Sequence, residues 1–298
     1  DFGHIVANHR LRVLRNIDGW LVLTVAALCL AGLLCIGSAT SDDALFGAQQ
    51  GRQSLFVVVG LGIGFFLLLP HYVHIMRASW FLYAVAVLAL VGLPFFAPSI
   101  NGARRWYAFP GFSIQPSEFA KIAVVLALAA LLRFKSRAKT FEGLVVPMLV
   151  AAVPALLILK QPDLGSSLVF GPVLLAMCYA AGASARSILL LLGWAGHGLG
   201  LGPQNRYDFL PYRSEDYLFA VVGEEGGYLG CLLILGLIAV LVLGLLNIAA
   251  RTRERFGRLV CVGVAAWLGS QSLFHVAVCG WLIPSTGLPL PLLSYGGS

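Results

Sequence analysis

Long apolar runs separated by short polar loops are the feature that most limits how this chain can fold. A helix needs about 20 apolar residues to cross the hydrocarbon core of a membrane. Because these runs are continuous rather than alternating, they exclude a transmembrane β-barrel. The sequence therefore predicts an all-α polytopic membrane protein, one domain over residues 1–298. We expect full spans at about 20–38, 54–69, 80–97, 117–132, 143–159, 164–183, 218–249 and 259–283.

The composition agrees with this class. Hydrophobic residues make up 59% of the chain and charged residues 11%, whereas a soluble domain has about 25% charged residues. The formal net charge is +7, but the basic residues fall in short loops, which suits anionic lipid and topology and gives no indication of a nucleic-acid partner. The six cysteines are scattered through apolar runs without metal-binding spacing, which is typical of small buried side chains. The first run lacks a small-residue cleavage site, so we expect no cleaved signal peptide.

The distribution of basic residues among the loops predicts how the chain is oriented across the membrane. With a cytoplasmic N-terminus, and with 187–195 counted as a crossing, 13 Lys and Arg residues fall in inside loops and six in outside loops. However, nine residues of helix span only about 14 Å, roughly half of a bilayer core. We therefore expect residues to be missing near 193–198, and more to be missing after Ser298, where the chain stops in a Pro/Gly-rich tail.

Acidic residues are concentrated in one segment, 206–230, which holds five of the 13 in the chain. By the predicted topology the loop part of this segment lies outside the cytoplasm. Glu215 and Asp216 precede an apolar run, so either could be a helix cap or first-turn acid. An acid in a cleft with apolar neighbours could instead have a raised pKa and act as a general base.

Other ionisable residues lie near the ends of predicted spans, where charge is costly. Glu118 and Lys121 share one face of a helix that Pro116 begins and Ser117 is expected to cap, and they form either a structural ion pair or part of a site. Asp163 either caps the next helix, with Ser166 and Ser167, or has a functional role. Composition alone does not separate an enzyme from a transporter.

The outer hairpin 98–116 carries two cations beside an aromatic ring, Arg104, Arg105 and Trp106. They either anchor the loop at the membrane surface or clamp the phosphate of a lipid, because guanidinium binds phosphate through two parallel hydrogen bonds.

Several motifs in a fixed order resemble the SEDS family (shape, elongation, division and sporulation), which includes RodA and FtsW. The similarity spans nearly the whole chain. The Pro-Leu-Pro tail favours the RodA branch, whereas the Gly-Glu-Glu and Asn-Gly-Ala elements lean towards FtsW. The motifs are Asn101-Gly-Ala-Arg-Arg-Trp106, Gln115-Pro-Ser-Glu-Phe-Ala-Lys121, Gln161-Pro-Asp-Leu-Gly165, Glu215-Asp-Tyr-Leu-Phe219, Gly223-Glu-Glu-Gly226 and Thr286-Gly-Leu-Pro-Leu-Pro291 with Ser294-Tyr-Gly-Gly-Ser298.

The resemblance implies a peptidoglycan glycosyltransferase that polymerises lipid II during cell wall elongation or division. It implies a bacterial cytoplasmic membrane location, an extracytoplasmic active site built by loops 98–116 and 196–217, and a class B penicillin-binding protein as partner. Family members have about nine to ten transmembrane helices, so we expect the last helix and part of an outer loop to be missing from this sequence. The family's essential loop aspartate matches Asp216. Its other motif residues match Trp106, Glu118, Lys121 and Asp163.

The mechanism we expect is an inverting transfer with Asp216 as the general base. The cations expected to stabilise the leaving pyrophosphate are Arg104, Arg105, Lys121 and Arg213, and a divalent ion, Mg²⁺ or Mn²⁺, is an open addition to them. A lipid II flippase and a non-catalytic scaffold for the penicillin-binding protein are the alternatives. The substrate-binding candidates are Arg104, Arg105, Trp106, Glu118, Lys121, Asp163, Arg213 and Glu215.

Overall fold

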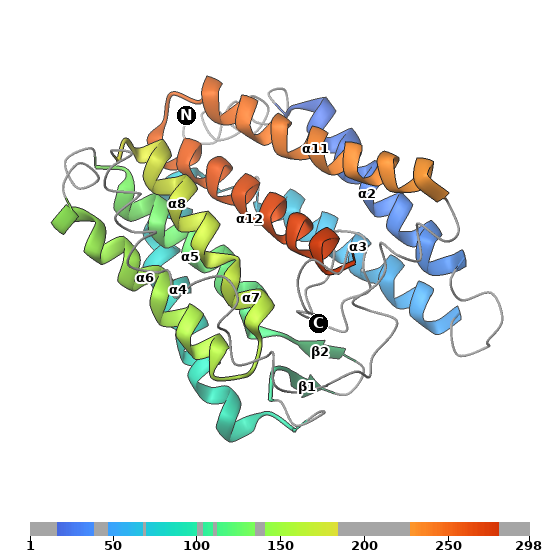
Figure 1. The fold of residues 1–298 in the computed structure, drawn as a ribbon, viewed down its shortest axis with the longest axis horizontal. Helices are drawn as coiled ribbons and strands as arrows, with labels where there is room; N and C mark the ends of the chain where they lie inside the picture. The colour runs from blue at the N-terminus through green and yellow to red at the C-terminus, as the bar shows by residue number, and fades with distance from the viewer. Residues whose placement is uncertain are drawn as a thin grey trace, which may run out of the picture.

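The computed structural model describes residues 17–38, 47–67, 70–99, 104–109, 112–134, 141–183 and 227–279, and nearly all of them are helical. Long helices run side by side, and one short hairpin lies at one end of the bundle (Figure 1). The elements are α2 (Gly19–Ser38), α3 (Gly47–Leu67), α4 (Tyr72–Phe96), β1 (Tyr107–Phe109), β2 (Phe112–Ile114), α5 (Pro116–Leu132), α6 (Phe141–Leu159), α7 (Leu164–Leu168), α8 (Phe170–Ala181), α11 (Gly227–Arg251) and α12 (Arg255–Cys279).

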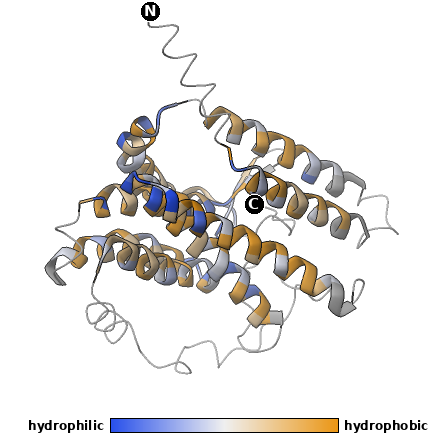
Figure 2. Cartoon of the chain, turned by 90° about the horizontal axis from the view of Figure 1, so that it is seen from above, coloured by the Kyte–Doolittle hydropathy of each residue, from blue (hydrophilic) through white to orange (hydrophobic). Residues whose placement is uncertain are grey.

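The helices have the length and composition of membrane spans. Four segments of the described part are long and apolar enough to cross a bilayer, and three more apolar helices are shorter. Hydrophobic residues cover the helices along most of their length, and hydrophilic residues gather mainly towards their ends (Figure 2). The predicted all-α polytopic class is confirmed. The four long segments are Tyr72–Phe96, Leu164–Ala181, Gly230–Arg251 and Arg255–Val278.

Helix α12 lies centrally and contacts α5, α8 and α11. Its side chains join the larger apolar core, which is built mainly from α4, α5, α6 and α8. A smaller core forms where Leu28 of α2 meets α11. Tight packing holds α12 in place, because a Cβ built on Gly263 would lie 2.7 Å from Val125 Cγ1 and 2.8 Å from Met177 Sδ. Only glycine allows the three helices to approach this closely.

Some helix boundaries differ from the predicted ones. Helix α4 begins at Tyr72 rather than near 80, because the His71 side chain caps it and accepts a hydrogen bond from Val73 N. His74 and Arg77, which were expected in a loop, therefore lie in its first two turns. Helix α3 likewise begins at Gly47, so Arg52 is helical.

The predicted span at 164–183 is divided into two helices, α7 and α8, around Val169. The break has a local cause: Pro172 has no N–H with which to bond the carbonyl of Leu168 four residues earlier. Helix α8 ends at Gly182, whose left-handed φ of 99° is the conformation glycine adopts most readily.

Candidate functional site

A buried charged network joins α5 to α12. Lys121 is only 2% exposed. Its Nζ donates to Glu118 Oε1 at 2.7 Å and to Gln271 Oε1 at 3.0 Å. The same amide oxygen of Gln271 accepts a hydrogen bond from Trp267 Nε1 at 2.7 Å, and the ammonium lies 5.4 Å from the centre of the Trp267 ring.

Each interaction lowers the cost of holding an ammonium away from water. A buried charge is tolerated when it is paired and hydrogen-bonded, and an aromatic face adds cation–π attraction. The ion pair foreseen between Glu118 and Lys121 is present. The structure adds Gln271, a partner 150 residues away in sequence. The network therefore fixes the start of α5 against α12.

A second set of contacts joins the two Gln-Pro motifs. Gln115 Nε2 donates to Asp163 Oδ2 at 3.3 Å, while Asp163 Oδ1 accepts from Ser166 N at 3.1 Å. Asp163 is thus the N-cap of α7, so the predicted capping contact is confirmed. Its carboxylate is 3% exposed and also holds the loop that precedes α5. The Asp163 side chain therefore both caps α7 and positions the loop before α5.

The predicted cap of α5 is wrong. Gln115, not Ser117, is the N-cap residue, and it makes no side-chain capping bond. Proline is favoured at the first helical position because its missing N–H would have been unpaired there, so Pro116 places the boundary before Ser117. The Ser117 hydroxyl is buried and has no hydrogen-bond partner within the described part of the chain.

The hairpin arginines hold the loop to neighbouring helices. The guanidinium of Arg105 donates from Nε to Gln161 O at 3.2 Å and from Nη2 to Pro162 O. Arg104 Nη1 donates to Pro94 O at the end of α4. Trp106 is half-buried beside them. These contacts support the interpretation that the two arginines anchor the loop, whereas a phosphate clamp stays a prediction.

The hairpin itself is an antiparallel pair in which Tyr107 faces Ile114. The Tyr107 hydroxyl donates to Ala89 O at 2.8 Å, and burial raises the pKa of this group. It therefore remains a hydrogen-bond donor near neutral pH and ties the hairpin to α4.

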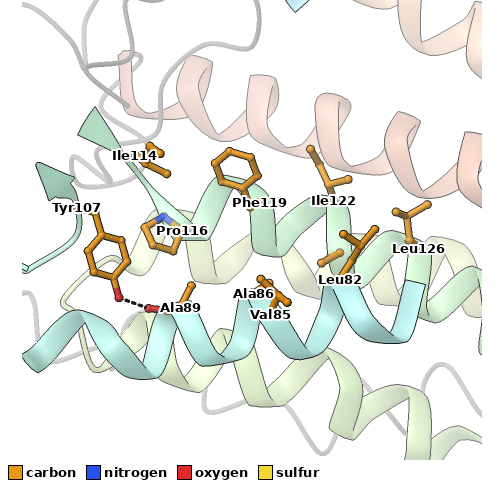
Figure 3. A pocket seen from close by; sticks show the side chains of 11 residues that line it. Leu82, Val85, Ala86, Ala89, Tyr107, Ile114, Pro116, Phe119, Ile122 and Leu126 are labelled. Carbon is orange, nitrogen blue, oxygen red and sulfur yellow. Dashed lines mark hydrogen bonds between the residues drawn. The ribbon is translucent and has the colours of Figure 1, made fainter. Parts of the chain in front are cut away.

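An apolar groove of about 300 Å³ runs between α4 and α5 below the hairpin. Figure 3 shows Leu82 and Val85 from α4 facing Phe119 and Ile122 from α5, with Tyr107 closing one end. Phe119 is 59% exposed, so the groove lies on the outer face of the bundle rather than in the core.

Several predicted site residues lie outside the described residues: Arg213, Glu215 and Asp216, with loop 196–217 and the expected gap near 193–198. Helix α11 runs from Gly227 to Arg251, about 37 Å at 1.5 Å per residue, so Gly227 lies at the opposite end of the bundle from Arg251.

Sequence reasoning missed Gln271 and Trp267, which complete the network around Lys121. Their signal was present, because a Gln and a Trp four residues apart lie on one face of a predicted membrane span, where polar groups are rare. Gln161, whose Nε2 donates to Leu90 O at 3.0 Å, was read only as part of a motif. The described residues contain no group of three His, Cys, Asp or Glu side chains that could hold a metal ion.

Taken together, the apolar helices and the buried charged network define a polytopic membrane protein with a polar site at one end of its bundle. The family model FTSW_RODA_SPOVE, described as cell cycle protein, matches residues 19–195 and 192–298. The chain belongs to this family.

Known proteins similar to this chain come from both named branches. A relative called probable peptidoglycan glycosyltransferase FtsW, from Geobacter metallireducens, is 30% identical over 97% of this chain and 92% of its own length. The crystal structure of the Thermus thermophilus rod shape determining protein RodA superposes with a TM-score of 0.80 at 32% identity, covering 94% of this chain and 91% of that one. The preference for RodA over FtsW stays a prediction.

A third match comes from a structure titled "Structural coordination of polymerization and crosslinking by a peptidoglycan synthase complex". It superposes with a TM-score of 0.83 at 29% identity and covers 94% of this chain and 92% of that chain. The described helices therefore follow an arrangement already seen within an assembled synthase.

Proposed function

We propose that this protein is a peptidoglycan glycosyltransferase that polymerises lipid II. The relatives named glycosyltransferase support the activity. The observation that carries the proposal is the buried Glu118–Lys121–Gln271 network. It lies at the end of the bundle from which α11 starts (Figure 1), and α11 is the first described helix after Asp216 in the sequence.

The reaction we assign is a single inverting displacement. Asp216 takes the proton from the 4-hydroxyl of the terminal GlcNAc of the acceptor, and that oxygen forms a bond to C1 of the donor MurNAc. The C1–oxygen bond to undecaprenyl pyrophosphate breaks, and the pyrophosphate leaves with the electron pair. An α-linked donor thus gives a β-1,4 product, which needs one base and no covalent intermediate.

The described residues divide the remaining tasks according to their exposure. Arg104 is exposed, so with Arg213 it supplies positive charge to the leaving pyrophosphate. Lys121 is buried and paired, so we assign it to holding Glu118 and the start of α5 in place. Asp163 holds the two Gln-Pro loops together.

The groove between α4 and α5 supports a lipid substrate. Its lining is almost entirely apolar, and it includes Pro116, two residues before Glu118. We propose that the isoprenoid chain of lipid II lies along this groove while its sugar headgroup reaches the polar site. Trp106 and Glu215 complete the headgroup contacts in this scheme.

The reaction requires a particular location and partner. We propose a bacterial cytoplasmic membrane with the polar site on the extracytoplasmic face, following the excess of basic residues in the loops assigned to the cytoplasm. The transpeptidase partner is a class B penicillin-binding protein. The match to a synthase complex whose title joins polymerization with crosslinking supports such an assembly.

The test is polymerisation of purified lipid II by the full chain, with a class B penicillin-binding protein present. Asp216→Asn should lower the rate by about 10²–10⁴-fold, the usual effect of losing a general base. Asp208→Asn, in the same acidic segment, is the matched control and should keep the rate. Thermal melting of both variants distinguishes lost chemistry from misfolding.

Two results would reject the proposal. Near-normal polymer from Asp216→Asn would remove the base. Translocation of lipid II across liposomes that continues unchanged in this variant, with no polymer from the wild type, would favour the flippase instead.

A further inference from the structure

A second cavity lies at the end of the bundle remote from the charged network. It has a volume of about 290 Å³ and is formed between the first turns of α4 and the last turn of α5. Arg255 Nη1 donates to Arg133 O at 2.8 Å, so α12 also begins at this end. The residues that line the cavity are Met76, Arg77, Trp80, Ala130, Leu131, Arg133 and Phe134.

Arg77 and Arg133, the two arginines of this cavity, form no ion pair with a carboxylate among the described residues. The ion pair found in that part of the chain joins Lys121 to Glu118. The Arg133 guanidinium contacts Met76 Sδ at 2.9 Å and lies 4.4 Å from the centre of the Phe134 ring. Its Nε is buried and lacks a hydrogen-bond partner among the described residues. The cavity therefore carries positive charge that the described part of the protein leaves uncompensated.

Glu254 is the acidic residue nearest in sequence to Arg253 and Arg255, and its carboxylate already accepts a hydrogen bond. Glu254 Oε2 accepts a hydrogen bond from Gly257 N at 2.7 Å and so holds the first turn of α12. Arg258, further along α12, also has a buried Nε without a partner among the described residues. Among the described residues no carboxylate pairs with the arginines at this end of the bundle, which leaves the cavity suited to an anionic ligand.

The remaining walls of the cavity are mainly apolar and are partly exposed on the surface of the bundle. Trp80 is 45% exposed and Phe134 is 51% exposed. Aromatic rings beside arginines mark the level of lipid headgroups on membrane proteins. A soluble anion would gain nothing from these rings, whereas a lipid would contact both the charge and the apolar surface.

We propose that this cavity binds one anionic glycerophospholipid. Its phosphate receives hydrogen bonds from Arg77 and Arg133, because the planar guanidinium donates to phosphate in bidentate geometry. Its acyl chain lies against Trp80 and Phe134. Basic pockets between transmembrane helices are known to hold phospholipid headgroups.

The site is independent of the proposed catalytic reaction. It uses no residue of the charged network and lies about 24 Å from it along α12, at 1.5 Å per residue between Arg255 and Gln271. A failed polymerisation assay would leave this proposal intact, and loss of lipid binding would leave the catalytic one intact.

Native mass spectrometry of the delipidated full chain tests the proposal directly. The protein is titrated with phosphatidylglycerol and, separately, with phosphatidylcholine of the same acyl chains. We expect one phosphatidylglycerol to bind with at least tenfold preference. Arg77→Gln should reduce that preference about fivefold, the effect of one arginine near a membrane surface. Arg77 is exposed, so this variant should fold normally.

Two further variants separate geometry from charge. Arg133→Lys keeps the charge but loses the planar fork, so it should weaken binding less than Arg133→Gln does. Arg253→Gln is the matched control, because it removes one positive charge from an exposed position outside the cavity lining. It should leave the preference unchanged.

Three outcomes would overturn the proposal. Equal binding of the two lipids would show that charge is not recognised. An Arg253→Gln effect as large as that of Arg77→Gln would reduce the binding to general electrostatic attraction. Displacement of the bound lipid by 10 mM inorganic phosphate, roughly a saturating level for a weak anion site, would assign the cavity to free phosphate rather than to a lipid.

Discussion

The two ends of this helix bundle hold their charges in opposite ways. At one end, Lys121 is buried and each hydrogen-bonding contact around it comes from the protein itself. At the other end, Arg77 and Arg133 line an open cavity without a carboxylate partner in the described residues. A satisfied network fixes local geometry, whereas an uncompensated one attracts a ligand. Charge should therefore support structure at the first end and binding at the second.

The largest effect should follow from removing the ammonium at the centre of the network. Lys121→Met leaves Glu118 and the Gln271 amide without their donor, and breaking a buried pair costs about 3–5 kcal/mol. Thermal unfolding in detergent should show a clearly lower midpoint. Arg253→Gln, an exposed charge change, should stay within about 0.5 kcal/mol of wild type. Equal midpoints for the two variants would erase the contrast between the ends.

A smaller effect should come from the packed layer between the two ends. Gly263→Ala places a methyl group within 2.8 Å of Val125 and Met177, and overpacking of this kind costs about 1–3 kcal/mol. Gly236→Ala in α11 is the control, because a methyl group added there would meet nothing within 4 Å. A midpoint for Gly263→Ala at or above that of Gly236→Ala would mean that the layer is loosely packed.

The cap of α7 should have a more modest effect. Asp163→Ala removes the acceptor of Ser166 N and of Gln115 Nε2, and loss of a helix cap costs about 0.5–2 kcal/mol. Asp163→Asn keeps an oxygen that can cap the helix and should retain most of the stability. Polymerisation measured on both variants gives a second comparison. If Asn restores the melting midpoint but not the rate, the carboxylate has a role beyond capping.

The smallest change in stability should occur at the arginine cavity. Arg77→Gln should shift unfolding by no more than about 0.5 kcal/mol, because Arg77 is exposed. The same variant should nevertheless lose preference for anionic lipid. Strong destabilisation in the absence of lipid would show that Arg77 supports the fold, as Lys121 does.

The fold and part of the site could be predicted because their signals are local. Continuous apolar runs indicate spans, and the three-residue spacing of Glu118 and Lys121 indicates a pair on one helix face. The cap at Asp163 follows from its place before a helix. The branch of the family and the missing loop residues stay predictions, because the motifs that would decide them lie largely outside the described part.

The errors and omissions depended on longer-range or competing effects. The bond between Lys121 and Gln271 joins residues 150 positions apart, and no local periodicity reports such a contact. Ser117 has the right residue type for a cap, but Pro116 at the first helical position places the N-cap two positions earlier, at Gln115. The early start of α4 depends on His71, a less common capping residue.

The closest packing of α12 against its neighbours lies midway between the two ends compared above. Gly263, its closest contact with α5 and α8, lies eight residues from Arg255 and eight from Gln271, giving two arms of about 12 Å each. A tilt of α12 about Gly263 would displace Arg255 and Gln271 by equal amounts in opposite directions. The close packing at Gly263 therefore determines the positions of both ends of α12, although the two proposed sites share no residue.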